Sequence, residues 1–306
     1  MNYFKEELTG FESWAHVYCS REAFGDLANY IFKKEGLLVQ EGIQNLTPGS
    51  NAVFKADNYV IKIFAPIESS FDTEADYHTE LAVLSFAKAR EIAIPKIIAS
   101  GSVIDKYLFR YIIMEFIDGQ DACDVLPDYN RDQKKDTVNQ IKTILKNLNQ
   151  PVDDLIKKKD FVVNTVRNER LSGLSEPFIA ELITHASNLD LSEMVLVHGD
   201  ITGENARINS DGELMLIDFA DCMIAPSYYE LPPIIFELFR CDREFVHEFV
   251  GDKDKDIFLD ELIDGLSIHM FCGNIIKDFL KRSEISCDSI TSILGFKELI
   301  KTKLYF

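Results

Sequence analysis

One stretch of the chain places polar residues between short apolar runs, and it limits the possible folds more than any other feature. Residues 194–221 are MVLVHGDITGENARINSDGELMLIDFAD. The runs MVLV and ELMLID are typical of short strands, ARIN lies between them, and NSDG at 209–212 is typical of a turn. This pattern predicts that Asp200 and Asn205 lie on a loop leaving one strand, and that Asp218 ends the last strand.

The same residues predict a particular chemistry. Side-chain oxygens of Asn205 and Asp218 would face one point, as a hard cation such as Mg²⁺ requires. Asp200, at the head of the loop, would orient a hydroxyl group. Phosphoryl transfer needs this arrangement, with metal ions between the phosphates and a carboxylate that directs the attacking oxygen. The alternative from the residues alone is a surface loop rich in polar turn formers.

Composition and charge restrict the class of protein. The chain has 306 residues, 46% of them hydrophobic and 27% charged, which indicates one large soluble domain or two lobes. A net charge of −19 disfavours nucleic acid and anionic lipid as partners and favours a cationic ligand. The six cysteines show no metal-ligand spacing, no apolar run is long enough to cross a membrane, and the amino terminus is not a signal peptide. We therefore expect a cytoplasmic protein with reduced thiols, while its oligomeric state stays open.

Helical and strand-like patterns alternate along the chain. Residues 11–34 have apolar groups at helical spacing, residues 51–66 are typical of a hairpin, and residues 70–95 are again helical. Strands are expected over 96–119, with turns at Gly101 and around Asp105. Further helices are expected at 131–149, 176–189, 228–249 and 256–281. The lysine run 157–159 is typical of a solvated helix face or turn rather than of a phosphate site.

This order predicts an α+β fold with two lobes. A small strand-rich lobe covers residues 1–115, of which 1–40 form a helical extension. Residues 116–119 are the hinge, and residues 120–306 form a larger helical lobe. Ligands favour the cleft between two such lobes.

The sequence VHGDITGEN…LMLIDFAD resembles the catalytic and metal loops of the aminoglycoside phosphotransferase branch of the protein-kinase-like fold. That wider group also includes choline, homoserine and methylthioribose kinases. The resemblance implies that Asp200 is the catalytic aspartate and that Asn205 and Asp218 hold Mg²⁺. It also implies that His198 packs within the loop rather than acting as a base.

The same resemblance implies a nucleotide site in the first lobe. Lys62, in the strand VIKIF, would contact the α- and β-phosphates, and Glu80 on the next helix would hold it, with Glu74 as the competing partner. In the loop 47–54, Ser50 or the backbone N–H of Asn51 would reach a phosphate. An ordinary hairpin turn is the alternative for that loop, and a lysine at a solvent-facing strand edge is the alternative for Lys62.

The run YIIMEFIDG resembles the hinge that an adenine ring contacts. The carbonyl of Glu115 and the N–H of Ile117 would bind the base, with Met114 behind it. A plain buried strand fits the same residues, and the choice between ATP and GTP stays open.

Several positions depart from the family pattern and indicate a divergent member. Ala206 and Arg207 follow Asn205 where relatives usually carry two apolar residues, Ala220 replaces a frequent glycine, and Asn149 stands where relatives often have histidine. The run 229–245 is somewhat similar to the hygromycin-type phosphotransferases, and Glu230 fits the residue that supports the catalytic loop. Asp218 and Tyr229 are too close in sequence for the long activation segment of a protein kinase, which disfavours a protein substrate.

The implied activity is Mg²⁺-dependent transfer of the γ-phosphate of ATP or GTP to a hydroxyl of an aminoglycoside-like cation, which would confer antibiotic resistance. Acidic residues near the carboxyl end would bind the ammonium groups, Glu237 and Asp242 first among them, with Asp256, Asp260, Glu261 and Asp264 as further candidates. A choline or amino-alcohol kinase of the same fold is the nearest alternative. A nucleotide-binding module without catalysis is the other.

Overall fold

A computed structural model describes residues 2–46, 49–70, 73–153, 155–156 and 169–306. The lysine run 157–159 and the start of the loop 47–54 lie outside the described residues. The chain divides into two compact units, one formed by Met1–Ser85 with Ile94–Asp118 and the other by Phe86–Ala93 with Gly119–Phe306. Both contain helices and antiparallel strands, which confirms the predicted α+β class.

The first unit is built on a five-stranded antiparallel sheet of order β1-β2-β3-β5-β4. Its strands are β1 (Gln44–Asn45), β2 (Ala52–Ala56), β3 (Tyr59–Ile63), β4 (Ile97–Ile104) and β5 (Leu108–Glu115). The helices are α1 (Phe11–Val17), α2 (Arg21–Lys34), the 3₁₀ turn η1 (Ile67–Ser69) and α3 (Thr73–Ala89), whose last residues belong to the second unit. The predicted opening helices and the hairpin are confirmed.

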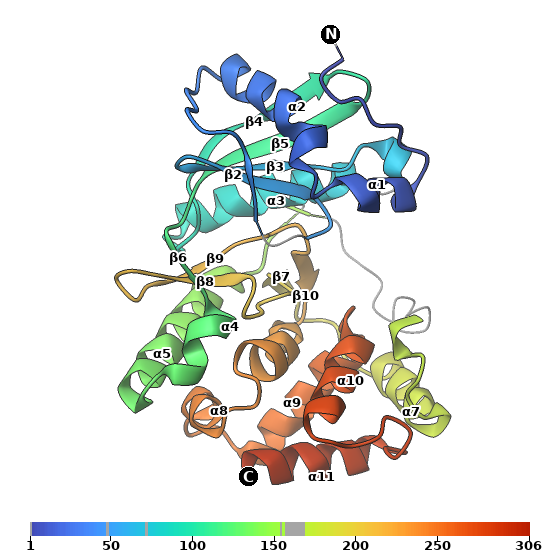
Figure 1. Ribbon diagram of the computed structural model, residues 1–306. Coiled ribbons are helices and arrows are strands. Elements are labelled where there is room, and N and C mark those ends of the chain that lie inside the picture. The colour runs from blue at the N-terminus through green and yellow to red at the C-terminus, as the bar shows by residue number, and fades with distance from the viewer. Residues whose placement is uncertain (1, 47–48, 71–72, 154, 157–168) are drawn as a thin grey trace. The chain divides into compact units, whose positions relative to one another are not determined.

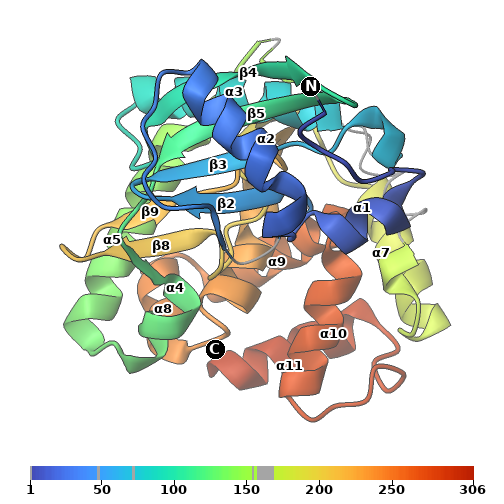
Figure 2. The ribbon, with the colours of Figure 1, turned by 45° about the horizontal axis from the view of Figure 1, so that its top comes forward.

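The alternation of side chains along β3 separates the two faces of this sheet. Ile61 and Ile63 are fully buried in a core formed with α1 and α2, whereas Lys62 between them points to the opposite face, toward α3. Figures 1 and 2 show α2 on one side of the strands and α3 on the other. A lysine in the middle of this strand is therefore directed inward, between sheet and helix.

The predicted turn at Gly101 is wrong, because β4 continues through this residue. Gly101 lies opposite Tyr111 of β5, and a Cβ at position 101 would be 2.8 Å from the Tyr111 hydroxyl oxygen. The glycine makes room for a ring on the neighbouring strand. The turn expected around Asp105 is present, where the N–H of Asp105 donates to the carbonyl of Tyr107.

The second unit contains two small antiparallel sheets, β10-β7 and β6-β8-β9. Their strands are β6 (Gly119–Asp121), β7 (Val195–Val197), β8 (Ala206–Asn209), β9 (Leu214–Leu216) and β10 (Met223–Ala225). The helices are α4 (Ala122–Val125), η2 (Leu126–Asp128), α5 (Arg131–Leu148), η3 (Glu169–Leu171), α7 (Glu176–Ser187), η4 (Ser227–Glu230), the π-helix η5 (Pro233–Leu238), α8 (Arg243–Val250), α9 (Lys255–Ile268), α10 (Cys272–Arg282) and α11 (Ile293–Leu304). The helices predicted at 131–149 and 176–189 are confirmed.

Two long predicted helices are instead broken into shorter ones. The segment 228–249 is interrupted because Arg240 and Cys241 adopt left-handed backbone angles, after which Asp242 caps the new helix α8. The segment 256–281 divides at His269, whose extended backbone ends α9 before α10 begins. The second break places His269 beside the loop that carries Asp200, where it bonds to the Gly199 carbonyl.

Candidate active site

Lys62 and Glu80 form a buried ion pair in the first unit. The Lys62 Nζ lies 2.7 Å from Glu80 Oε2, with side chains 4% and 1% exposed. The competing residue Glu74 lies on the same helix but pairs with Arg110 and, at 3.1 Å, with His78 in an exposed position. The structure therefore brings Lys62 together with Glu80 and not with Glu74.

The loop before β2 is fixed from two sides. The carbonyl of Ser50 accepts a hydrogen bond of 2.9 Å from the indole N–H of Trp14 on α1. The buried side chain of Asn51 accepts one of 3.3 Å from the N–H of Ala65. Ser50 itself is exposed. Sequence reasoning did not identify Trp14, since the contact joins residues 36 positions apart.

The hinge residues end the strand β5. Met114 is buried at the end of the strand, while Glu115 is exposed and its N–H donates to the carbonyl of Lys96. The next residue, Phe116, donates its N–H to the carbonyl of Asn58. Backbone hydrogen bonds within the first unit therefore hold the N–H groups of Glu115 and Phe116. These two groups adjoin the Glu115 carbonyl and the Ile117 N–H that were expected to bind the base.

In the second unit, buried side chains hold the loop that follows β7. The carboxylate of Glu230 accepts the N–H groups of both His198 and Gly199. His198 accepts the N–H of Asp200 on Nδ1, so its Nε2 carries the proton and donates to the carbonyl of Ile217. The ring packs on buried Phe219. His198 is thus fully occupied within the loop.

Hydrogen bonds from Asn205 and Ile217 fix the relative positions of Asp200, Asn205 and Asp218 in the second unit. The Asn205 amide nitrogen donates to the Asp200 carboxylate at 2.7 Å and to the Asp200 carbonyl at 3.0 Å. The Ile217 N–H donates to the Asn205 carbonyl at 3.0 Å. Ile217 therefore lies next to Asn205 across the β8–β9 hairpin, and Asp218 is the residue that follows it. Asp218 itself has a φ of 60°, a backbone conformation that costs energy for a residue other than glycine and is concentrated at functional sites.

Burial, together with the nearby carboxylates of Asp221 and Asp218, raises the pKa of Asp200 to about 7, against the lowering effect of the hydrogen bond from Asn205. Asp221 was not identified from the sequence, although it follows Asp218 by three residues. The cluster has an excess of negative charge that a cation would offset.

A pocket of about 260 Å³ lies beside Asp200 in the second unit. Its lining residues are Asp200, Pro233, Glu237, Phe271, Asn274, Ile275 and Asp278. Glu237 comes from the π-helix η5, and burial raises the pKa of its carboxyl group. Its Oε1 is buried without a hydrogen-bond partner among the described residues. Arg282 lies 3.6 Å from Glu237 and 2.7 Å from Asp278, so one guanidinium group holds both carboxylates.

The other acidic candidates do not line this pocket. Asp242 caps α8 and pairs with the buried Lys134 at 2.8 Å, and it is not among the residues that line this pocket. The remaining four pair with basic groups of their own unit: Asp256 with Lys301, Asp260 with Lys297, Glu261 with Lys253 and Asp264 with His185. The sequence shows their charge but not these partners.

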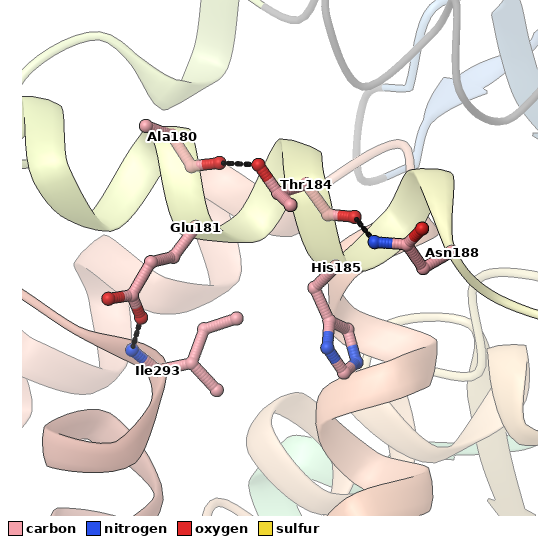
Figure 3. A pocket seen from close by; sticks show the side chains of 6 residues that line it. All are labelled: Ala180, Glu181, Thr184, His185, Asn188 and Ile293. Atoms are coloured by element: carbon pink, nitrogen blue, oxygen red, sulfur yellow. Dashed lines mark hydrogen bonds between the residues drawn. The ribbon is translucent and has the colours of Figure 1, made fainter.

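A larger hollow of about 510 Å³ lies along α7 and contains none of the predicted site residues. Figure 3 shows Glu181, Thr184 and Asn188 paired with backbone groups. Of these two pockets, the one beside Asp200 contains predicted site residues.

One residue that supports the loop carrying Asp200 comes from far along the chain. The fully buried His269 donates from Nε2 to the carbonyl of Gly199 and accepts the Phe271 N–H on Nδ1. Its ring stacks on Tyr229 with centroids 4.3 Å apart. A single histidine between apolar helices gave no signal of this role in the sequence.

The departures from the family pattern have structural partners. Arg207 binds Asp121 and the Gly119 carbonyl on the adjacent strand β6. Asn149 donates to the carbonyl of Leu196 at 2.9 Å, next to the same loop. Neither displaces Asp200, Asn205 or Asp218.

Within the described residues, no three His, Cys, Asp or Glu side chains are grouped to hold a metal ion by themselves. No helix of the same residues has the length and hydropathy needed to span a membrane.

Comparison with known proteins supplies the context. The pattern of the phosphotransferase enzyme family, abbreviated APH, matches residues 48–252. No curated protein matches the chain. The chain is similar to the GDP complex of aminoglycoside 2'-phosphotransferase-IIIa, at 16% identity and a TM-score of 0.60, covering 91% of this chain and 97% of that one.

Two other solved structures have the same fold. A ternary complex of aminoglycoside phosphotransferase APH(4)-Ia with AMP-PNP and hygromycin B is 14% identical, with a TM-score of 0.60 over 90% of this chain and 98% of that one. Choline kinase LicA from Streptococcus pneumoniae is 14% identical, with a TM-score of 0.53 over 91% and 99%. These likenesses confirm the predicted kinase-like fold.

Proposed function

The chain belongs to the phosphotransferase enzyme family, and on this premise we propose that it transfers the γ-phosphate of ATP or GTP to a hydroxyl of a small cationic molecule. The observation that carries the proposal is the position of Asp200, whose carboxylate is bonded to Asn205 and opens onto a pocket containing Glu237 and Asp278. A catalytic aspartate and an acidic acceptor site thus lie together in one unit.

The first unit supplies the nucleotide contacts in this proposal. Lys62, held by Glu80, binds the α- and β-phosphates. Ser50 and the N–H of Asn51 bind a phosphate from the loop, and the Glu115 carbonyl and Ile117 N–H bind the base with Met114 behind it. Nucleotides in the similar structures, GDP and AMP-PNP, support a nucleotide donor without choosing between ATP and GTP.

The donor set around Asp200 fits Mg²⁺. Asn205 turns its amide nitrogen to Asp200, which leaves its amide oxygen for another partner, and Asp218 adds a carboxylate. Two protein ligands are enough, because Mg²⁺ is commonly completed by substrate phosphates and water. When bound, the ion offsets the charge of the phosphates. The excess negative charge that raises the pKa of Asp200 supports a cation here.

Asp200 orients the acceptor. One of its carboxylate oxygens is occupied by Asn205, and we assign the other to the acceptor hydroxyl. The free oxygen is the one that takes up the hydroxyl proton as the acceptor oxygen attacks. His198, with both ring nitrogens occupied, positions the N–H of Asp200 and does not take the proton.

The acceptor is cationic because the pocket supplies Glu237 and Asp278 against the single guanidinium of Arg282. An aminoglycoside-like acceptor is supported by the aminoglycoside phosphotransferases of the same fold, and its modification would confer antibiotic resistance. The volume of about 260 Å³, near the lower limit of ligand pockets, favours an amino alcohol as second candidate. Six free cysteines support a reducing, cytoplasmic location.

A phosphorylation panel tests the proposal. Aminoglycosides, hygromycin B, choline and other amino alcohols are each offered with ATP and with GTP, with and without Mg²⁺. Turnover of one acceptor class identifies it, and Asp200→Ala should abolish that turnover while circular dichroism shows an intact fold. Full turnover by this variant refutes the role of Asp200. Nucleotide binding without turnover of any acceptor favours the non-catalytic module instead.

A further inference from the structure

Trp14 is the only tryptophan of the chain and lies in α1, outside the segment that matches the family. Its side chain is fully buried, with its ring edge-on to Phe24 at 5.7 Å between centroids and beside Tyr18 at 6.4 Å. The indole N–H nevertheless has one polar partner, the carbonyl of Ser50 at 2.9 Å. A buried core residue therefore reaches the loop to which we assign the nucleotide phosphates.

This bond also sets the direction of the following N–H group. The peptide between Ser50 and Asn51 is trans and planar, so its carbonyl and its N–H point in opposite directions. With the carbonyl directed at Trp14, the N–H of Asn51 is directed away from the α1 layer. That N–H is the backbone donor proposed for a phosphate.

The surroundings make this orientation rigid. Asn51 is held through its side chain by Ala65, and the next residue, Ala52, is paired with Ile63 across the hairpin. The Trp14 ring packs on Phe24, which packs in turn on Phe4, and Asp105 accepts the N–H groups of Tyr3 and Phe4. The amino-terminal segment thus connects the turn at Asp105, between β4 and β5, to the loop that carries Ser50 and Asn51.

We propose that Trp14 is a positioning residue for the donor nucleotide, orienting the Asn51 N–H toward a phosphate through its hydrogen bond to Ser50. This inference rests on the proposed function, because it assumes that the loop binds a nucleoside triphosphate. It gives the helical extension a role in donor binding that the family pattern, which begins at residue 48, does not contain.

The experiment removes the indole N–H of Trp14 as a hydrogen-bond donor and keeps the packing of its ring. Because no other tryptophan is present, biosynthetic replacement by β-(3-benzothienyl)alanine, which has sulfur in place of the indole N–H, changes position 14 alone. Trp14→Phe is the genetic counterpart. Calorimetry measures affinity for MgATP, MgGTP, adenosine and guanosine. Loss of one oriented hydrogen bond should weaken triphosphate binding about three- to tenfold and leave nucleoside binding unchanged.

Phe24→Leu is the matched control, because Phe24 is fully buried against Trp14 but donates nothing to the loop. It should lower the melting temperature and keep the wild-type ratio of triphosphate to nucleoside affinity. Equal loss for triphosphate and nucleoside, or an unchanged triphosphate affinity in both Trp14 replacements, overturns the inference. Absence of triphosphate binding in the wild-type protein overturns the proposed function instead, before any variant is made.

Discussion

The ammonium group of Lys62 lies 2.7 Å from a carboxylate oxygen of Glu80, and the two side chains are among the most deeply buried charges of the first unit. Burying two charges is costly, and their attraction repays that cost only while both are present. A pair of this kind is weak support for stability alone. The phosphate binding proposed for Lys62 gives a reason for an ion pair in the interior.

We predict that Lys62→Met and Glu80→Leu each lower the free energy of unfolding by about 3 kcal/mol, because each leaves one buried charge without its partner. The double variant should lose much less than the sum, since no unpaired charge remains. Nucleotide affinity should stay low in the double variant. Urea denaturation and calorimetry check both statements, and additive stability losses would contradict the pairing.

Gly101 gives a prediction that depends only on packing. Gly101→Ala would place a Cβ 2.8 Å from the Tyr111 hydroxyl, which is held by Lys34 and Glu35 and cannot move away easily. We expect a loss of about 2 kcal/mol. Gly25→Ala is the control: it lies inside α2 with no atom within 4 Å of the new Cβ, and should stabilise by up to about 1 kcal/mol. Thermal denaturation compares them, and equal shifts would refute this account.

The same glycine shows where prediction from the sequence ends. The hairpin that carries Lys62 and the loop that carries Asp200 follow from local patterns, since turn residues and alternating apolar positions lie within a few residues of each other. Gly101 looks like a turn residue until its neighbour Tyr111 on the next strand is known. Asp278 of α10, and His269 between α9 and α10, lie some seventy residues beyond Asp200, a relationship that no local pattern contains.

His269 predicts an acid-sensitive stability. Burial lowers its pKa to about 3, against the raising effect of its bond to Gly199, whereas an unfolded histidine titrates near 6.5. Below pH 6.5 the unfolded chain binds a proton that the folded chain excludes. The contribution of neutral His269 to the free energy of unfolding is therefore complete above pH 6.5 and is lost as the pH falls toward 3. At pH 5 the loss is about 2 kcal/mol.

His269→Gln should remove this contribution, so that the change in unfolding free energy from pH 7.5 to pH 5 favours the folded state more than in the wild type, by about 2 kcal/mol. His16→Gln, at an exposed position of α1, should keep the wild-type dependence. Urea titrations at the two pH values measure it. If His269→Gln keeps the full acid sensitivity, the buried neutral imidazole is not its source.

Glu237 tests the acceptor pocket. Its Oε1 is buried without a hydrogen bond among the described residues, and Arg282 approaches it only to 3.6 Å. A substrate ammonium group would supply the missing donor. We predict that Glu237→Gln, which keeps the size and removes the charge, raises the KM for the acceptor about tenfold and leaves the KM for the nucleotide unchanged.

Asp256→Asn is the control for this change, because Asp256 is acidic and carboxyl-terminal but is exposed and paired with Lys301 outside the pocket. If the overall negative charge of the protein attracted the substrate, both variants would raise the acceptor KM alike. If the pocket carboxylate binds the ammonium directly, only Glu237→Gln does so, and its effect persists at high salt because a buried contact is poorly screened. Steady-state kinetics at low and high ionic strength separate the two cases.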